Sequence, residues 1–78
     1  MPRFYFHMRD GDHLLEDPDG TDLPDVDAAR TEANVSARHL LADRVRAGEV
    51  IGDQRFEIVD EAGDLRAVLR MRDVLMLE

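Results

Sequence analysis

The densest group of potential ligand atoms in this sequence is the segment EDPDGTDLPD, residues 16–25. A calcium-binding loop needs carboxylates at alternating positions, glycine at the sixth and a bidentate glutamate at the twelfth. Asp17 and Asp19 have that spacing, but Gly20 comes two positions early and the twelfth position is Ala28. The pattern favours a solvated turn whose aspartates bond to their own backbone. The alternative, a weak divalent-ion site, would use Asp17, Asp19 and Asp22.

Histidines are the other candidate metal ligands, and the sequence spreads its three over the chain. His7 and His13 flank a predicted hairpin turn, with Asp10 and Asp12 between them. The predicted strand pairing points the two histidines to opposite faces of the sheet. His39 lies on the polar side of a predicted helix. We therefore expect no metal centre and no cofactor.

Nucleophilic catalysis has few possible residues here, because the chain contains no cysteine and its one serine is Ser36. Ser36 lies three residues before His39, and residues at that spacing are neighbours on a helix. A serine nucleophile also needs an oxyanion hole, and the N–H groups of a regular helix are already used. The glycines form no phosphate-binding pattern. We expect no catalytic residue and no enzymatic activity.

The overall composition limits the remaining function classes. A length of 78 residues indicates one domain, residues 1–78. Eighteen acidic against ten basic residues give a net charge of −8, which disfavours binding to nucleic acid. No apolar stretch reaches the roughly 20 residues of a membrane span, and no signal-peptide pattern is present. We expect a soluble, cytoplasmic protein without a membrane partner.

The N-terminal third is predicted to form a hairpin. Residues 3–9 alternate in a two-residue period, which is typical of a strand, and Asp10-Gly11 is a common centre of a two-residue turn. Such a turn would pair Phe6 with Leu15 and His7 with Leu14. The core face of this hairpin would then carry Phe4, Phe6, Met8 and Leu15.

A long helix is predicted over residues 25–47. Pro24 restrains the preceding residue to extended geometry, Asp25 is a good N-cap, and Gly48 is a natural end. Apolar residues recur at helical spacing along one stripe. This stripe consists of Val26, Ala29, Ala33, Ala37 and Leu40, with Leu41 at its margin.

A second hairpin is predicted from residues 55–60 and 65–71, joined by a turn at 61–64. Its pairing puts Phe56 opposite Leu69 and Ile58 opposite Ala67, all facing inward. The predicted fold is α+β, ββαββ, with a four-stranded antiparallel sheet and one long helix packed on one face.

The helix is longer than the predicted strands, so its C-terminal overhang needs cover. The overhang carries Leu41 and Val45, and Val50 and Ile51 follow it. Either residues 74–77 of the tail or a second subunit would supply this cover. The tail itself is predicted as a helical turn or as a strand extension.

The outer face of the predicted sheet is basic although the chain is acidic. We interpret it as a docking surface for an acidic partner, a nucleic acid or a second copy. The alternative is an ordinary exposed face whose arginines pair with Glu57 and Glu16 across strands. A base-stacking platform uses several aromatic side chains and this face has one tyrosine, so nucleic acid is disfavoured. The candidate interaction surface is Arg3, Tyr5, His7, Arg55, Glu57, Arg66 and Arg70, with Leu14, Val59 and Val68 among them.

Three stretches resemble a family of small bacterial proteins of unknown function: MPRFYFHMRDGD, the EDPDGTDLPD that leads into AAR, and RFEIVDEAGDL. Members of that family open M-P-R-Y-F-F-H and carry an acidic E-D-x-x-G-x-x-L-P-D segment. The resemblance implies a bacterial, cytoplasmic, stand-alone domain. It leaves Arg3 and His7 as motif positions that the core does not explain. The shared positions that match the predicted core are Phe4, Phe6, Leu15, Phe56 and Ile58.

A weaker likeness is to HicB-type antitoxins, whose small domain also runs from a hairpin through Leu-Pro into a helix. DLPDVDAARTEA is similar to that outline. The leading expectation is a non-enzymatic, homodimeric protein-interaction module that uses the outer sheet face or the helix overhang. The alternative is an antitoxin-like or regulatory protein that masks a toxin or a nucleic-acid-acting partner.

Overall fold

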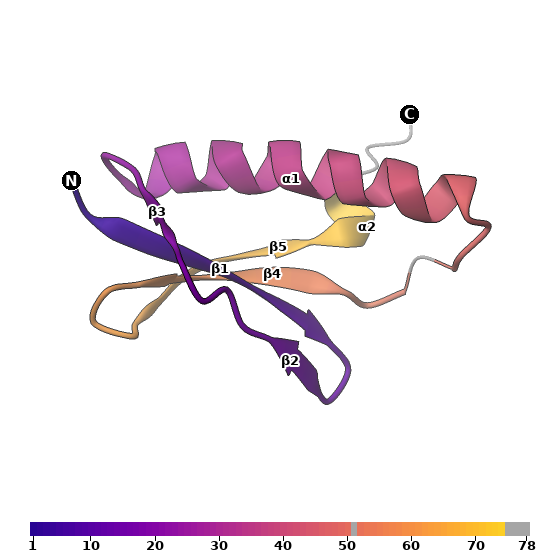
Figure 1. The fold of residues 1–78 in the computed structure, drawn as a ribbon, viewed down its shortest axis with the longest axis horizontal. Coiled ribbons are helices and arrows are strands. Elements are labelled where there is room, and N and C mark those ends of the chain that lie inside the picture. Colours follow the sequence, from indigo (N-terminus) through magenta and orange to yellow (C-terminus); the bar gives the residue numbers. More distant parts are fainter. Residues whose placement is uncertain (51, 75–78) are drawn as a thin grey trace.

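A computed structural model describes residues 1–50 and 52–74 of the chain. It confirms the predicted α+β architecture: an antiparallel sheet with one long helix along one side (Figure 1). No helix in this described part is long and apolar enough to cross a membrane. In chain order the elements are β1 (Arg3–Asp10), β2 (His13–Leu15), β3 (Thr21–Asp22), α1 (Val26–Arg46), β4 (Arg55–Asp60), β5 (Leu65–Arg70) and α2 (Met71–Val74).

The two hairpins join through their first strands, so β1 and β4 lie at the centre of the sheet. They pair antiparallel from Phe4 opposite Asp60 to Arg9 opposite Arg55. The strand order is β2-β1-β4-β5. The two-residue strand β3 also pairs with β1, and was not predicted, because the loop after β2 returns to the start of β1.

The second hairpin has the predicted register over most of its length. Phe56 is opposite Leu69 and Ile58 is opposite Ala67. Next to the turn the register shifts, and Val59 pairs with Leu65 where Arg66 was expected. This bulge adds one residue to β5 and changes the face to which Arg66 points.

The first hairpin has a different register from the one predicted. Met8, not Phe6, lies opposite Leu15, because the two turn residues are Gly11 and Asp12 and not Asp10-Gly11. Gly11 has a φ of +60°, which is the conformation that a primed turn needs at its first central position. The shift of two positions preserves the faces. Leu15 is nevertheless 72% exposed, so its placement in the core was wrong.

Helix α1 begins and ends where the sequence predicts. An Asp25 carboxylate oxygen accepts a hydrogen bond from the Ala28 N–H at 2.8 Å, and Gly48 follows the helix with a φ of +74°. The fully buried stripe runs in steps of four, so Leu41 belongs to it and Leu40 lies at its flank. This corrects the predicted stripe. Its members are Ala29, Ala33, Ala37 and Leu41.

The core lies between α1 and the sheet, and three alanines let the helix backbone come close to the strands. The largest fully buried side chains are Phe4, Ile58 and Met71, which fill this layer. Met71 begins α2, and its N–H bonds the Gln54 carbonyl at 2.9 Å, which extends the β4–β5 ladder by one step. The start of the tail is therefore a helical turn that buries Val74, whereas residues 75–78 lie outside the described part of the chain.

Candidate functional site

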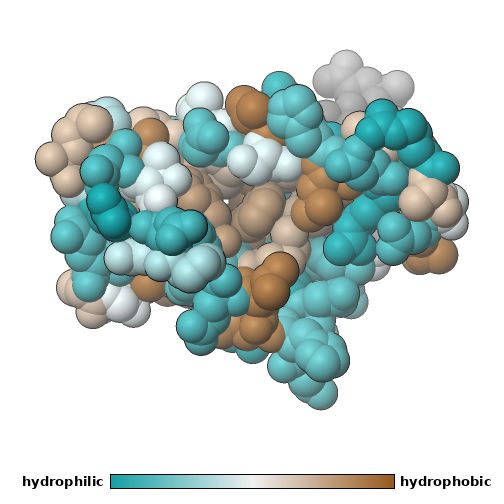
Figure 2. All heavy atoms as spheres, viewed as in Figure 1, coloured by the Kyte–Doolittle hydropathy of each residue, from teal (hydrophilic) through white to brown (hydrophobic). Residues whose placement is uncertain are grey.

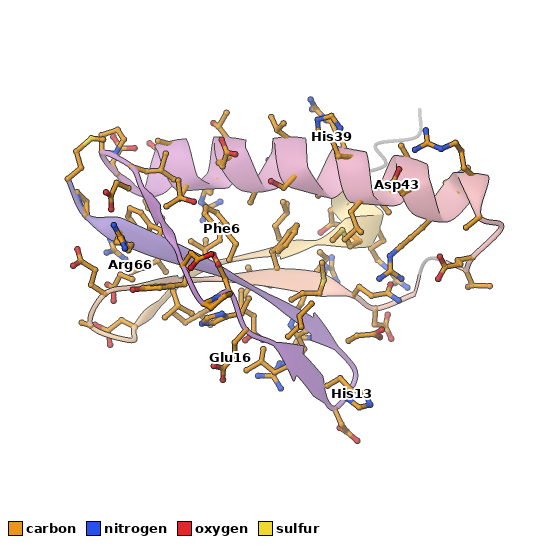
Figure 3. All side chains as sticks on the ribbon, viewed as in Figure 1. Phe6, His13, Glu16, His39, Asp43 and Arg66 are labelled. Carbon is orange, nitrogen blue, oxygen red and sulfur yellow. The ribbon has the colours of Figure 1, made fainter. Side chains whose placement is uncertain are left out.

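One face of the sheet packs against α1, and no helix in the described part of the chain covers the opposite face, here called the outer face (Figure 3). The pairing registers define which side chains share it, because residues that face each other across strands point the same way. Its members are Arg3, Tyr5, His7 and Arg9 of β1, Leu14 of β2, Arg55, Glu57 and Val59 of β4, and Leu65, Val68 and Arg70 of β5.

Three arginines lie in one row across the outer face, because Arg9 pairs with Arg55 and Arg55 pairs with Arg70. Arg9 Nε is 3.0 Å from Glu57 Oε2, and an Arg55 guanidinium nitrogen is 3.4 Å from the same oxygen. The hydrogen bond from Arg9, against the cost of burial, lowers the pKa of Glu57, and both guanidinium charges add to this. Two guanidiniums thus share one carboxylate, which leaves an excess positive charge.

Arg9 is missing from the predicted interaction surface, although the two-residue period of β1 would have placed it there. The two arginines at the ends of the surface are individually neutralised: Arg3 pairs with Asp22 at 2.9 Å and Arg70 with Asp73 at 3.0 Å. The excess positive charge therefore covers a smaller part of the outer face than the sequence predicts, and it is concentrated at Arg9 and Arg55.

Apolar side chains lie beside this charged row. Leu65 is 57% exposed and Val68 is 46% exposed, and Val59 lies half-buried between them and Tyr5. In the register, Val68 is the direct neighbour of Glu57. The β4–β5 part of the outer face thus combines exposed branched aliphatics with arginine, and arginine is enriched at protein interfaces.

Arg66 does not join the other predicted surface residues. The bulge turns it toward the edge of the core, where its guanidinium lies 3.3 Å from an Asp60 carboxylate oxygen. It lines a hollow with Phe4, Pro24 and Val26, on the helix side of the sheet (Figure 3). Strict alternation along β5 predicts the opposite, because a bulge leaves no clear signal in the sequence.

The acidic segment covers the other end of the outer face, where Tyr5 and His7 stack with ring centroids 6.2 Å apart. The backbone N–H of Asp17 donates to His7 Nδ1 at 3.0 Å. In turn, Asp17 Oδ2 accepts the N–H of Phe6, and Oδ1 accepts those of two residues in its own loop, Asp19 and Gly20, each at 3.2 Å. The loop is therefore fastened to β1 by side-chain-to-backbone bonds.

Burial of Asp17 opposes ionisation, but the N–H groups of Phe6, Gly20 and Asp19 together lower the pKa of its carboxyl below the usual value. Gly20 has a φ of +71°, and a Cβ there would lie 2.9 Å from Tyr5 Cε1. Only glycine permits so close an approach to the ring. The family positions His7 and Gly20 thus both hold the acidic loop on β1, a role that no local sequence pattern reveals.

The three candidate metal ligands are engaged in different ways. Asp17 accepts backbone N–H groups, Asp22 pairs with Arg3, and Asp19 contributes its carbonyl to Arg3. Within residues 1–50 and 52–74, no group of three or more acidic, histidine or cysteine side chains is placed to hold a metal ion. Ser36 and His39 lie exposed on α1.

The overhang at the C-terminal end of α1 is the other interaction surface predicted from the sequence. A groove of about 510 Å³ lies beside the C-terminal half of α1, and Val45 there is 60% exposed. Val74 of α2 closes one side, so the tail covers part of the overhang, as one of the two expectations had it. Ile51 and residues 75–77 of the predicted cover lie outside the described residues.

Comparison with known proteins gives one match. The family model DUF6894, a domain of unknown function, matches residues 3–72. No curated protein and no solved structure matches the chain, so the likeness to HicB-type antitoxins has no support. The matched range includes the opening strand, the acidic loop, α1 and the second hairpin. The chain therefore belongs to the DUF6894 family, a domain of unknown function.

Proposed function

We propose that this protein is a non-enzymatic interaction module whose outer face binds an acidic segment of another protein. The observation that carries the proposal is the pair of guanidiniums, Arg9 and Arg55, that share the single carboxylate of Glu57 beside exposed Val68. A partner carboxylate near Arg55 would balance the excess charge. Apolar partner side chains would cover Val68 and Leu65.

Charge complementarity of this kind steers encounter and sets register, and the apolar contacts supply most of the affinity. The net charge of −8 opposes an acidic partner at long range, so recognition depends on local contacts with the arginine row. Arg55 retains donors that Glu57 does not use, since one of its nitrogens makes the pair at 3.4 Å. A bidentate guanidinium–carboxylate pair is the contact that this geometry favours.

A catalytic role has less support. Ser36 and His39 lie on a regular helix, and His7 already accepts a hydrogen bond from Asp17. The antitoxin-like alternative stays a prediction without a specific observation in its favour. A bacterial, cytoplasmic setting also stays a prediction, drawn from the family resemblance and from the sequence's lack of a signal-peptide pattern.

Site-specific photo-crosslinking in native cells tests the proposal. A benzophenone amino acid replaces Val68 on the outer face or, as a matched control, Val35 on the solvent side of α1, because the two valines are 46% and 43% exposed. We expect one major adduct from position 68 and none of the same mass from position 35. The crosslinked segment of the partner should be acidic.

Two charge reversals then test the arginine row with the purified partner segment. Arg55→Glu changes the charge of the outer face, whereas Arg46→Glu makes the same change at the exposed end of α1. We expect Arg55→Glu to weaken binding by about tenfold or more and Arg46→Glu by less than about twofold. Equal effects, or equal adducts from both valines, would contradict docking on the outer face.

A further inference from the structure

The helix-side face of the sheet is also incompletely covered. A helix is about 10–12 Å wide, whereas four strands at about 4.8 Å spacing are wider. Helix α1 makes its main contacts with β5, β4 and α2, and the β1–β2 hairpin extends away from it (Figure 1). The inner side of this hairpin is therefore left without a helix above it.

A groove lies where the helix fails to reach. It has a volume of about 370 Å³ and runs between Leu40 of α1 and Leu15 of β2, with Phe6, Met8 and Phe56 at its floor. Figure 2 shows apolar atoms in the hollow between α1 and the strands in front, surrounded by hydrophilic ones. This groove belongs to neither of the surfaces considered above, because the outer face and the overhang lie on other sides of the molecule.

Leu15 is the feature of this groove that needs an explanation. It is 72% exposed, although it points to the same face as Phe6 and Met8, which pack against the core. A leucine so exposed at the edge of an apolar hollow forms a projection beside a recess. Burying it would remove apolar surface from water at about 25 cal/mol per Å².

The two rims of the groove carry opposite charges. Arg44 lines the helix rim, and Glu16 and Asp17 line the strand rim. Arg44 makes no ion pair within the described residues. The carboxyl of Asp17 is kept ionised, because backbone N–H groups outweigh the cost of its burial and lower its pKa. A basic rim faces an acidic rim across an apolar floor.

We propose that this groove binds the same groove of a second copy, in a twofold-symmetric homodimer. A twofold axis along the groove lays the strand rim of one copy over the helix rim of the other. Leu15 of each copy then packs on the partner's Leu40, and each Arg44 lies over the partner's acidic rim. An isologous contact requires such self-complementarity, with a projection and a recess on the same patch.

A second copy fits this groove better than an unrelated apolar helix does. An unrelated helix would cover the apolar floor. It would leave either Arg44 or the acidic rim without an opposite charge, unless it carried an acidic residue opposite Arg44 and a basic residue opposite the acidic rim. The chain itself supplies both signs at the required separation. The proposal is independent of the outer-face docking, which uses the opposite side of the same strands.

Adjacent leucines of β2 provide the matched test, because Leu14 lies on the outer face and Leu15 on the groove side. Analytical ultracentrifugation from 1 µM to 1 mM should show a monomer–dimer equilibrium for the wild-type chain. Leu15→Asp should weaken dimerisation at least about tenfold, since a carboxylate would have to be buried in the contact. Leu14→Asp should leave the dimerisation constant within about twofold and should instead affect the outer face.

Circular dichroism of each variant verifies that the fold is retained, which the exposure of Leu15 favours. In samples that mix isotope-labelled and unlabelled copies, intermolecular NOEs are expected between the Leu15 methyls of one copy and the Leu40 methyls of the other. A wild-type chain that stays monomeric at 1 mM overturns the proposal. Dimerisation that survives Leu15→Asp, or that falls equally with Leu14→Asp, overturns it as well.

Discussion

The two hairpins of this protein are held in place by different forces. The β4–β5 hairpin lies under α1 and contributes Phe56, Ile58 and Ala67 to the buried core. The β1–β2 hairpin has a short second strand whose three residues are all exposed, and its loop is fastened through the side chains of Asp17 and His7. Apolar burial therefore stabilises the β4–β5 hairpin and also β1, whose Phe4 is buried, whereas directional hydrogen bonds position β2 and the loop that follows it.

This difference explains where candidate interaction surfaces occur. The well-covered hairpin presents only its outer side to solvent, whereas the β1–β2 hairpin is open on its inner side as well. A segment positioned by hydrogen bonds keeps its shape without using its apolar side chains, which then stay available for a partner. The loop after β2 is thus fastened to β1, while Leu15 of β2 stays exposed.

The largest expected effect is a truncation in the covered hairpin. Ile58→Ala removes a side chain that is fully buried between α1 and the sheet, and should lower the free energy of unfolding by about 2–5 kcal/mol. Leu15→Ala in the other hairpin should change it by less than about 0.5 kcal/mol. Urea denaturation at low micromolar concentration measures both. Similar losses at the two positions would contradict the contrast between the hairpins.

An intermediate effect is expected from the loop that rests on β1. Gly20→Ala introduces a Cβ 2.8 Å from Arg3 Cγ at a φ of +71°. Gly11→Ala is the matched control, because Gly11 has a φ of +60° but nothing within 4 Å of the added atom. We expect losses of about 2–4 kcal/mol for Gly20→Ala and about 1–2 kcal/mol for Gly11→Ala.

Thermal melts of the two glycine variants separate backbone strain from the close contact. Equal destabilisation would mean that the loop can move away from Tyr5 at no cost, and that the hydrogen bonds of Asp17 do not hold it. Amide exchange at Phe6 would then be fast in both variants. We expect fast exchange only in Gly20→Ala.

The contrast between the hairpins also explains what the sequence could predict. Two-residue alternation was enough to assign side chains to faces, and it survived a two-position error in the register of β1 and β2 because the side-chain period is two. The register of β4 and β5 was predicted correctly only away from the turn, where Gly63 takes a φ of +86°: Asp60 bonds Asp64 across the turn, and the bulge restores the predicted pairing from Ile58 and Ala67 onward. Leu41 is buried and Leu40 is not because of the strands that the helix covers. Tertiary packing decides which strands these are, so the sequence pattern of the helix does not show it.

The candidate sites were less predictable than the fold. Arg9 could have been included by the same alternation that placed Tyr5 and His7. Arg66 could not have been excluded, because the bulge between Ile58 and Val59 depends on backbone geometry. The bond from Asp17 to His7 joins β1 to a loop residue beyond β2, ten positions along the chain, so neither composition nor period indicates it.

The smallest expected effect concerns the carboxylate that fastens the loop. Asp17→Asn keeps one acceptor oxygen but replaces Oδ2, which accepts the Phe6 N–H at 3.2 Å. This substitution should lower the free energy of unfolding by about 1–3 kcal/mol at neutral pH. Asp19→Asn removes the same charge from a side chain that accepts no hydrogen bond among the described residues, and should be nearly neutral. Chemical denaturation at pH 7 compares the two.

The pH dependence sharpens this prediction. Although burial opposes it, three backbone N–H groups lower the pKa of Asp17 in the folded state, so the unfolded chain binds its proton first as the pH falls. The stabilisation by Asp17 is therefore complete above the unfolded pKa of about 4 and is lost as the pH falls through the lower folded value. Asp17→Asn should flatten the loss of stability between about pH 5 and pH 2, whereas Asp19→Asn should not. A wild-type pH profile in both variants would mean that packing, and not Asp17, holds the first hairpin.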